Sequence, residues 1–583
     1  MKKILISLIC SILFISMVKA KTSAPIDIRY ASVLDLIEAM DTKIITSEQL
    51  INLYLERIQA YNETYNAVLF INENAISEAK KIDEARARNE ELGRLAGIPI
   101  IIKTNIDATE FATTGGSKAL IDNLPNEDAV VIQKLKEEGA IILASANMSE
   151  FAFSAYNSNS SYGNVHNAFN QKYTSYGSSG GSAVSVALSF APIALGTDTN
   201  SSVRIPASAA NLVGIRPSIN QISTDGVIPY DTTRDVVGIL TKTVADNNYV
   251  YQILTESSVT NERIDLNGVV IGIPLEFYEG SKSASLAVNQ KTFLPIKEMM
   301  EGKIAYLESQ GATIVHLDKF YTSTNYNTAQ TTMAGFTFCK GFNDYISDHD
   351  SKITSFNALT NSKGKIYSLS GYNSMCNYKL TNAQLNAKQT FQNYIASIYE
   401  TQKIDLIIYP TIKNELALQG ENKLVAPGSN LGSVINYPSI TVPLGFYQDL
   451  PYGLEFMAPT NQEALLYEVA AIYEQSNTFT VTNTAPSLYE IPDSVNELVI
   501  TYQEIIENHS NLSLIKEIQT FFSSYNEIEN KEQLATAILE IKQTPRENAV
   551  ISNAREGTIY VLYFFSGLLI MLLCLKQKKT PKP

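Results

Sequence analysis

Short apolar runs alternate along this chain with amphipathic stretches of helical spacing. From residue 34 to about residue 89, apolar side chains recur every three or four positions, and "TSEQLINLYLERIQAYNETYN" opens with a Thr-Ser helix cap. "IPIII", "AIILA" and "PIALG" are compact apolar runs, typical of buried strands. This alternation predicts an α/β fold, with one large domain over residues 28–485 that has a mixed β-sheet core surrounded by helices.

The second half of the chain continues the pattern less regularly. "GVVIGIPLEF", "GATIVHL" and "DLIIYPT" predict further core strands. Residues 320–400 are rich in Tyr, Asn and Thr and only weakly periodic, so we expect a helical cap or a substrate-facing lobe there. Residues 490–556 are polar and helical in pattern and predict a stalk that follows the large domain.

The two ends of the chain differ from its body. Residues 1–20 combine a basic start, an apolar stretch and a small residue at the end, which predicts a signal peptide, with an N-terminal membrane anchor as the alternative. Residues 559–575 are uncharged and are followed by a basic tail, 576–583, which predicts one transmembrane helix with a short cytoplasmic tail. A buried C-terminal helix is the alternative there. We therefore expect a membrane protein whose body lies outside the cytoplasm: periplasmic, extracellular or luminal.

Charge and cysteine content narrow the possible partners. The 583 residues include 59 acidic and 45 basic ones, a net charge of −14, and such a surface repels phosphate backbones, so no nucleic-acid partner is expected. Within the large domain only Cys339 and Cys376 remain; they can pair in an oxidising compartment or stay as two buried thiols. No Cys/His group has metal-ligand spacing, so we expect neither a metal nor a cofactor.

A Gly/Ser-rich loop, "GSSGG" at 177–181, directly precedes a helical pattern of small residues. It fits the G-x-S-x-G motif of α/β-hydrolase esterases with Ser179 as nucleophile. That motif needs a buried strand before it, and "HNAFNQKYTSY" is not one. It also needs a catalytic histidine, and none of the downstream candidates lies in a recognisable catalytic loop: His316, His349 and His509. The esterase remains an alternative.

Lys103 is a single charged residue at the end of the apolar run "IPIII". Burial of a lysine lowers its pKa, and a neutral lysine can accept a proton from a serine, as in Ser–Lys hydrolases. The alternative is an exposed lysine at a strand end.

Several motifs occur in a fixed order along the chain: "GIPIIIKTNID", "TTGGSKAL", "ANMSEFAF", "GSSGGSAVSVALSFAPIALGTDTNSSVRIPASAANLVGIRPS" and "GVIPYDTTRDVVGILTKTVAD", followed by "DLIIYPT", "NYPSITVPLGF" and "LPYGLEFMAP". Together they resemble the amidase signature family over roughly residues 30–480. The resemblance implies an amide hydrolase that cleaves a carboxylic amide to an acid and an amine or ammonia.

The resemblance also implies a catalytic triad. It places the base at Lys103, a relay serine after a cis peptide bond at Ser178, and the nucleophile at Ser202 within the family's GTD-x-G-G-S-x-R-x-P motif. The backbone N–H groups of residues 199–202, which are Thr199, Asn200, Ser201 and Ser202, are expected to form the oxyanion hole.

Further residues around this motif have expected roles as well. Met148, Ser178 and Phe151 are candidates for substrate binding, with a plain core role as the alternative for Met148 and Phe151. Asp198 and Arg204 are expected to hold the loop rigid as a buried ion pair.

The chain departs from the family motif in two places. Asn200-Ser201 stands where the family has Gly-Gly, and Ile239 replaces a proline. Glycines allow positive φ and a close approach of substrate, so the change narrows the substrate range or silences the enzyme, and a catalytically inactive binding protein is the alternative function. Asn200 also starts a glycosylation sequon, but a glycan there would block the oxyanion hole.

The expected substrate is a small-molecule or lipid-like amide. The family's tRNA-dependent amidotransferase component is a third candidate, which the predicted signal peptide and membrane helix oppose.

Overall fold

The computed structural model describes residues 26–257, 263–277, 294–317, 337–377, 381–421 and 430–476, with residues 320, 329 and 379. The chain divides into two compact units, residues 1–485 and 486–583, and every described residue belongs to the first. The predicted signal peptide, stalk, transmembrane helix and tail (1–20, 490–556, 559–575 and 576–583) lie outside the described residues.

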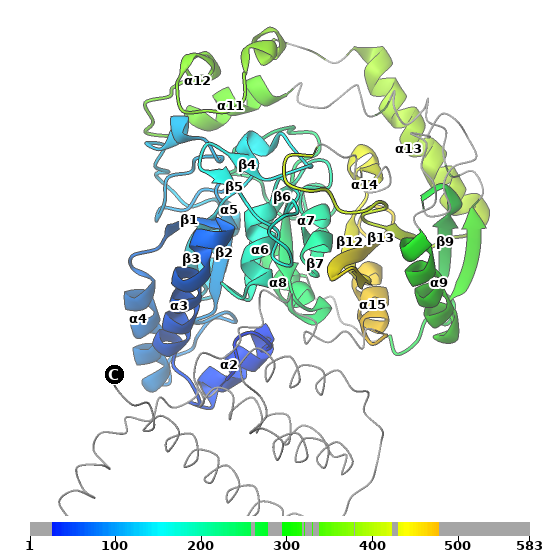
Figure 1. Cartoon of the computed structure of the whole chain (residues 1–583), viewed down its shortest axis with the longest axis horizontal. Helices are drawn as coiled ribbons and strands as arrows, with labels where there is room; N and C mark the ends of the chain where they lie inside the picture. Colours follow the sequence, from blue (N-terminus) through cyan, green and yellow to red (C-terminus); the bar gives the residue numbers. More distant parts are fainter. Residues whose placement is uncertain are drawn as a thin grey trace, which may run out of the picture. The chain divides into compact units, whose positions relative to one another are not determined.

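An eleven-stranded mixed sheet forms the centre of this unit, in the order β1-β3-β2-β6-β8-β7-β12-β13-β11-β9-β10 (Figure 1). Pairing is parallel between β3, β2 and β6 and between β11, β9 and β10, and antiparallel elsewhere. The strands are β1 (Val68–Ile71), β2 (Pro99–Lys103), β3 (Ile141–Ala146), β6 (Ile193–Asp198), β7 (Val213–Arg216), β8 (Val236–Thr241), β9 (Val270–Pro274), β10 (Thr313–Leu317), β11 (Leu406–Pro410), β12 (Ser439–Tyr447) and β13 (Leu450–Met457). A separate two-stranded ladder joins β4 (Asn159–Ser160) and β5 (Gly163–Asn164). The expected mixed sheet is confirmed.

Helices cover this sheet (Figure 1). They are α2 (Val33–Asp41), α3 (Ser47–Tyr65), α4 (Ala75–Ala87), α5 (Val130–Glu137), α6 (Gly180–Ala187), α7 (Arg204–Ala209), α8 (Val244–Thr255), α9 (Leu294–Ser309), α11 (Phe338–Ile346), α12 (Phe356–Asn361), α13 (Asn382–Gln402), α14 (Leu431–Ile435) and α15 (Glu463–Glu474). Short 3-10 turns are η1 (Lys118–Leu120), η2 (Glu150–Ala152), η3 (Leu275–Phe277) and η4 (Ser370–Met375). Every residue of β2, β3 and β6 is buried, so both faces of these strands are covered.

Local sequence explains where the first predicted helix begins and ends. The Thr46 side chain accepts from the N–H of Gln49 while the Gln49 side chain accepts from the N–H of Thr46, which is a capping box at the start of α3. Asn66 ends the helix in the left-handed conformation, with φ 52°. The predicted helix and its cap are therefore confirmed, but the wholly helical pattern expected over residues 34–89 is wrong at β1 (Val68–Ile71), which pairs with β3.

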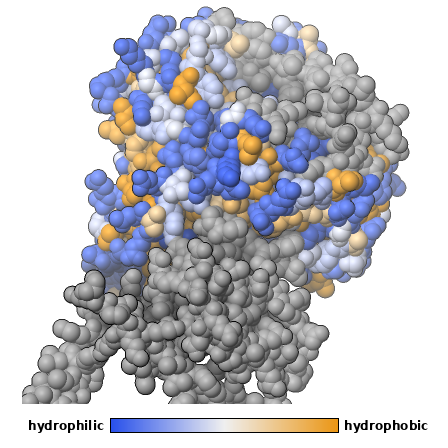
Figure 2. All heavy atoms as spheres, in the orientation of Figure 1, coloured by the Kyte–Doolittle hydropathy of each residue, from blue (hydrophilic) through white to orange (hydrophobic). Residues whose placement is uncertain are grey.

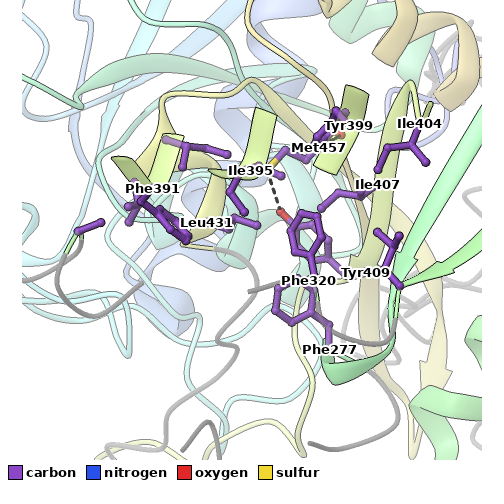
Figure 3. Close-up of a cluster of buried hydrophobic side chains, with 14 residues drawn as sticks. Phe277, Phe320, Phe391, Ile395, Tyr399, Ile404, Ile407, Tyr409, Leu431 and Met457 are labelled. Carbon is purple, nitrogen blue, oxygen red and sulfur yellow. Dashed lines mark hydrogen bonds between the residues drawn. The ribbon is translucent and has the colours of Figure 1, made fainter. Parts of the chain in front are cut away.

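Side chains of α13 and β11 belong to one buried hydrophobic cluster (Figure 3). Phe391, Ile395, Ile407 and Tyr409 are at most 1% exposed, and each such burial contributes about 1.5–3 kcal/mol. The Tyr409 ring also packs edge-on against Phe277, with ring centres 5.1 Å apart. This cluster holds the C-terminal strands against the rest of the sheet.

The expected helical lobe is found within residues 337–377, where α11, α12 and η4 pack together. Cys339 on α11 and Cys376 after η4 form a disulfide, with a Cα–Cα distance of 4.8 Å. Of the two alternatives for these cysteines, the structure contains the paired one.

The described surface is mixed in character. Figure 2 shows apolar residues interspersed with polar ones on the face that it draws. Large exposed apolar side chains come from elements far apart in the sequence, among them Leu34, Ile121 and Leu385.

Candidate active site

The candidate site lies at the carboxyl ends of two neighbouring parallel strands. β2 ends at Lys103 and β6 ends at Asp198, and the two strands pair directly. The loop after β6 carries Ser202, and the loop before α6, which packs on both strands, carries Ser178. Sheet geometry therefore brings together the three residues that the family resemblance selected.

Lys103 is fully buried and its ammonium group has three acceptors. Nζ donates to Ser178 Oγ at 2.7 Å, to Thr197 Oγ1 at 2.8 Å and to the Thr197 carbonyl at 3.3 Å. Burial lowers the pKa of Lys103 to about 7, although Asp198 and Asp235 act in the opposite direction. The alternative of an exposed lysine is wrong, and near neutral pH a large fraction of Lys103 is uncharged.

The Ser178 loop is packed too tightly for side chains at its glycines. The Gly177–Ser178 peptide bond is cis, as the resemblance implied. A Cβ on Gly181 would lie 2.1 Å from the Asn147 carbonyl oxygen, so only glycine fits. The Ser178 carbonyl accepts from the N–H of Ser149 at 3.0 Å. These contacts fix Ser178 beside Lys103.

Ser202 lies next to this loop and is nearly buried. The N–H of Ser179 donates to the Ser202 carbonyl at 3.1 Å, which joins the two serine loops. Ser202 is 4% exposed, whereas Ser178 is fully buried. Within the described residues, Ser202 Oγ has no hydrogen-bond partner. The hydroxyl that retains exposure is thus the one expected to attack a substrate.

The loop has fewer oxyanion donors than expected. The N–H of Ser201 donates to Asp198 Oδ1 at 2.9 Å, so the prediction that Ser201 contributes a donor is corrected. In the part of the chain that the structure describes, the N–H groups of Thr199, Asn200 and Ser202 donate to no acceptor. These three remain available to a developing oxyanion.

A buried charge network holds the nucleophile loop. Arg204 Nε lies 3.2 Å from Asp198 Oδ2 and Arg216 NH1 lies 3.2 Å from Asp198 Oδ1, all with fully buried side chains. Arg204 also pairs with Glu455 of β13. Burial alone would raise the pKa of Asp198, but the two arginines outweigh it and lower it. The expected Asp198–Arg204 pair is confirmed, and Arg216 and Glu455 extend it.

Three further residues, which the sequence patterns did not predict, hold the nucleophile loop. Asp235 Oδ1 accepts from Thr199 Oγ1 at 2.5 Å, Arg234 NH1 donates to Asn200 Oδ1 at 3.0 Å, and Ser201 Oγ donates to Asn430 Oδ1 at 2.9 Å. Burial raises the pKa of Asp235 to about 7, with Asp231 acting in the same direction. Arg234 and Asp235 are adjacent charged residues just before β8. They lie near the nucleophile loop because β8 runs antiparallel beside β6 and Val236 pairs with Asp198.

The two candidate pocket residues are both buried. Met148 is 0% exposed and Phe151 is 2% exposed, which favours the core role for each. Phe153 is half-buried and lies next to Phe151: its ring centre is 5.7 Å from that of Phe151 and 5.3 Å from those of Tyr230 and Tyr372. Phe153, which the sequence pattern did not single out, is therefore a half-buried residue within an aromatic cluster.

The alternative nucleophile Ser179 has a structural contact. Its Oγ donates to the Thr197 carbonyl at 3.2 Å and accepts from the Thr197 N–H at 3.3 Å. His349 is paired elsewhere, with Nε2 2.8 Å from Asp107 Oδ2, and His509 lies outside the described residues. No described histidine has a hydrogen bond to Ser179.

Comparison with known proteins is decisive for the family. A family model named Amidase matches residues 49–467. The chain belongs to the amidase family. Among curated relatives, the chain is similar to a glutamyl-tRNA(Gln) amidotransferase subunit of Clostridium novyi, 29% identical over 76% of this chain and 97% of the relative. The protein of the same name from Natranaerobius thermophilus is 30% identical over 74% of this chain and 92% of the relative.

Solved structures give the same family assignment. The native peptide amidase of Stenotrophomonas maltophilia matches with a TM-score of 0.68 and 26% identity, over 76% of this chain and 96% of that one. An amidase family protein of Bacillus anthracis matches with a TM-score of 0.63 and 28% identity, over 76% of this chain and 90% of that one. The family and these relatives support an enzyme that hydrolyses amides.

The localisation predicted from the two ends of the chain is corrected. Relatives that match 76% of this amidase are named as subunits of an amidotransferase of glutamyl-tRNA(Gln), which contradicts a body outside the cytoplasm. In the described part of the chain, no helix combines the length and the apolar character needed to cross a membrane. Residues 1–20 and 559–575, on which the prediction depended, lie outside that part.

Proposed function

We propose that this amidase cleaves a carboxylic amide through an acyl-enzyme at Ser202, with Ser178 and Lys103 as the proton relay. The observation that carries the proposal is the 2.7 Å contact between Lys103 Nζ and Ser178 Oγ, within a buried site where the pKa of Lys103 falls to about 7. A lysine in this state accepts a proton near neutral pH, which an ordinary lysine does not.

The proposed reaction begins with proton transfer to Lys103. Neutral Lys103 accepts the proton of Ser178, which accepts that of Ser202, and Ser202 Oγ bonds to the carbonyl carbon of the substrate. Negative charge develops on the carbonyl oxygen, where the unused N–H groups of the nucleophile loop stabilise it. The proton then passes back along the relay to the nitrogen as the C–N bond breaks, and the amine leaves. Water attacks the acyl-enzyme by the same route and releases the acid.

The direct test is covalent labelling with a fluorophosphonate probe, combined with hydrolysis of a panel of amides of graded acyl length. Ser202→Ala is expected to abolish labelling, and Lys103→Met and Ser178→Ala are expected to lower its rate by about 10²-fold or more. Ser179→Ala is the matched control, since this neighbouring buried serine has no catalytic role in the proposal and should still be labelled.

Two outcomes of this test would support other functions. A labelled Ser202→Ala protein with an unlabelled Ser179→Ala protein would support the esterase alternative. A wild-type protein that is never labelled and hydrolyses nothing in the panel would support the inactive binding protein.

A second candidate function is the glutamine-hydrolysing part of an amidotransferase. Its support is the name of the curated relatives, which are 29–30% identical to this chain. The same Ser202 chemistry would then release ammonia from glutamine. Glutaminase activity that exceeds the activity on every other amide of the panel would favour this candidate, and its absence would count against it.

A further inference from the structure

Asn200 lies two residues before the proposed nucleophile, Ser202. It is half-buried, whereas Thr199 and Ser202 are each 4% exposed and Ser201 is fully buried. Asn200 is therefore the most exposed residue of the nucleophile loop. Its Cα lies at most about 7.6 Å from that of Ser202, because two peptide units join them. Among the loop residues 199–202, the Asn200 side chain is therefore the one most accessible to a substrate that binds at Ser202.

Arg234 fixes which way the Asn200 carboxamide faces. The guanidinium NH1 donates to Asn200 Oδ1 at 3.0 Å. A guanidinium has donors only, so the oxygen of the carboxamide must face Arg234 and the NH2 group must face away. Arg234 is itself held, because it is fully buried and its carbonyl accepts from Arg216 NH2 at 2.7 Å. The carboxamide is thus oriented before any substrate binds.

The Nδ2 group of Asn200 keeps its hydrogen-bonding capacity. Within the described residues this group donates to no acceptor. It is not a buried atom without a partner, so it keeps access to solvent. The proposed oxyanion donors are backbone N–H groups of the same loop, so the scissile carbonyl does not need Nδ2. Its two N–H bonds therefore remain available to another part of the substrate.

We infer that Asn200 Nδ2 is a substrate-recognition donor that selects amides with a second acceptor oxygen a few bonds from the scissile carbonyl. The inference rests on the proposed function, because it takes Ser202 as the nucleophile. The substrate class is that of short oxo-amides and N-acyl amino-acid amides, whose second carbonyl lies close to the first. A glycine at this position would have no such donor, so the departure from the family motif sharpens selectivity instead of silencing the enzyme.

Two substrates that differ by one carbonyl test this inference. The kcat/KM of the wild type for 4-oxopentanamide is expected to exceed that for pentanamide by about tenfold, the equivalent of about 1.4 kcal/mol. Asn200→Asp keeps the contact of an oxygen with Arg234 but replaces the donor by a second acceptor, so the ratio is expected to fall to about one. Asn200→Gly, which has no side-chain donor, is also expected to give a ratio of about one. Asn52→Asp, a half-buried position on α3, is the matched charge control and should keep the wild-type ratio.

The ratio separates recognition from catalysis, because effects of a variant on the fold or on the oxyanion apply to both substrates. A wild-type ratio near one, or a ratio that Asn200→Asp leaves unchanged, would overturn the inference. Hydrolysis of neither amide by a protein that the fluorophosphonate still labels at Ser202 would overturn it too, while leaving the proposed nucleophile in place. Absence of labelling would instead overturn the proposed function on which the inference rests.

Discussion

The pH dependence of this amidase should report the burial of Lys103. With a pKa of about 7, about half of Lys103 is neutral at pH 7, compared with about three parts in ten thousand for an ordinary lysine with a pKa of 10.5. The neutral fraction falls to about one hundredth at pH 5. We therefore expect kcat/KM for an uncharged amide to rise about 50-fold between pH 5 and pH 7 and to level off above pH 8.

The same burial should destabilise the fold. The folded-state pKa of Lys103 lies below its unfolded value, so between pH 7 and 10.5 the unfolded chain binds the extra proton and stability rises with pH. Replacing the amine with an apolar side chain removes this cost. Lys103→Met is expected to raise the free energy of unfolding at pH 7, by at most about 4 kcal/mol, with the gain disappearing above pH 10.5. Its hydrolytic activity is expected to be lost.

Two measurements check this reasoning: kcat/KM from pH 5 to pH 9, and urea unfolding of the wild type and Lys103→Met at pH 7 and pH 10. Asp235→Asn is the matched variant, because burial also raises the pKa of Asp235 to about 7. An activity profile that is flat from pH 5 to pH 7, or that rises only near pH 10, would refute the reasoning. So would an inflection that disappears in Asp235→Asn, since the titrating group would then be the aspartate.

Three further predictions concern a tightly packed glycine, an ion pair and the disulfide. Gly181→Ala is expected to lower labelling of Ser202 by at least tenfold, because its Cβ would lie 2.1 Å from a backbone carbonyl, whereas Gly302→Ala on α9, with no atom within 4 Å, should leave labelling unchanged; equal effects would contradict this. Burial alone would lower the pKa of His349, but Asp107 raises it overall, so the stability from this pair is complete below the unfolded pKa of 6.5 and is lost as pH rises through the raised value. His349→Gln should therefore lower the free energy of unfolding by about 1 kcal/mol at pH 5.5 and by less at pH 9 in urea titrations, and a pH-independent loss would be evidence against the charged pair. Cys339→Ser opens a loop of 37 residues and should cost about 4 kcal/mol in the same titrations; dithiothreitol should lower the stability of the wild type to that of the variant without affecting the variant, and no effect on the wild type would count against the disulfide.

The sequence alone was sufficient for elements whose signals are local. The cap before α3 and the apolar run ending at Lys103 predicted a helix and a strand that the structure contains. The motifs around Ser178 and Ser202 identified the family, because each motif is a short stretch whose backbone must take one shape. The mixed sheet followed from the alternation of these elements, although the antiparallel strands β12 and β13 were recognised only as family-like segments.

Tertiary structure alone decided how the nucleophile loop is held. Arg234, Asp235 and Asn430 contact Asn200, Thr199 and Ser201 from positions at least 34 residues away, and no local pattern encodes such contacts. The tertiary structure also determines that the N–H of Ser201 donates to Asp198 Oδ1. Several backbone donors of the loop could bond to this carboxylate, and which ones do depends on the geometry of the folded loop. The sequence by itself therefore selected the side chains that we propose for the chemistry. The fold decided which groups are buried, which are already paired and which remain available to a substrate, since burial and hydrogen-bond partners depend on chain segments that are distant in sequence.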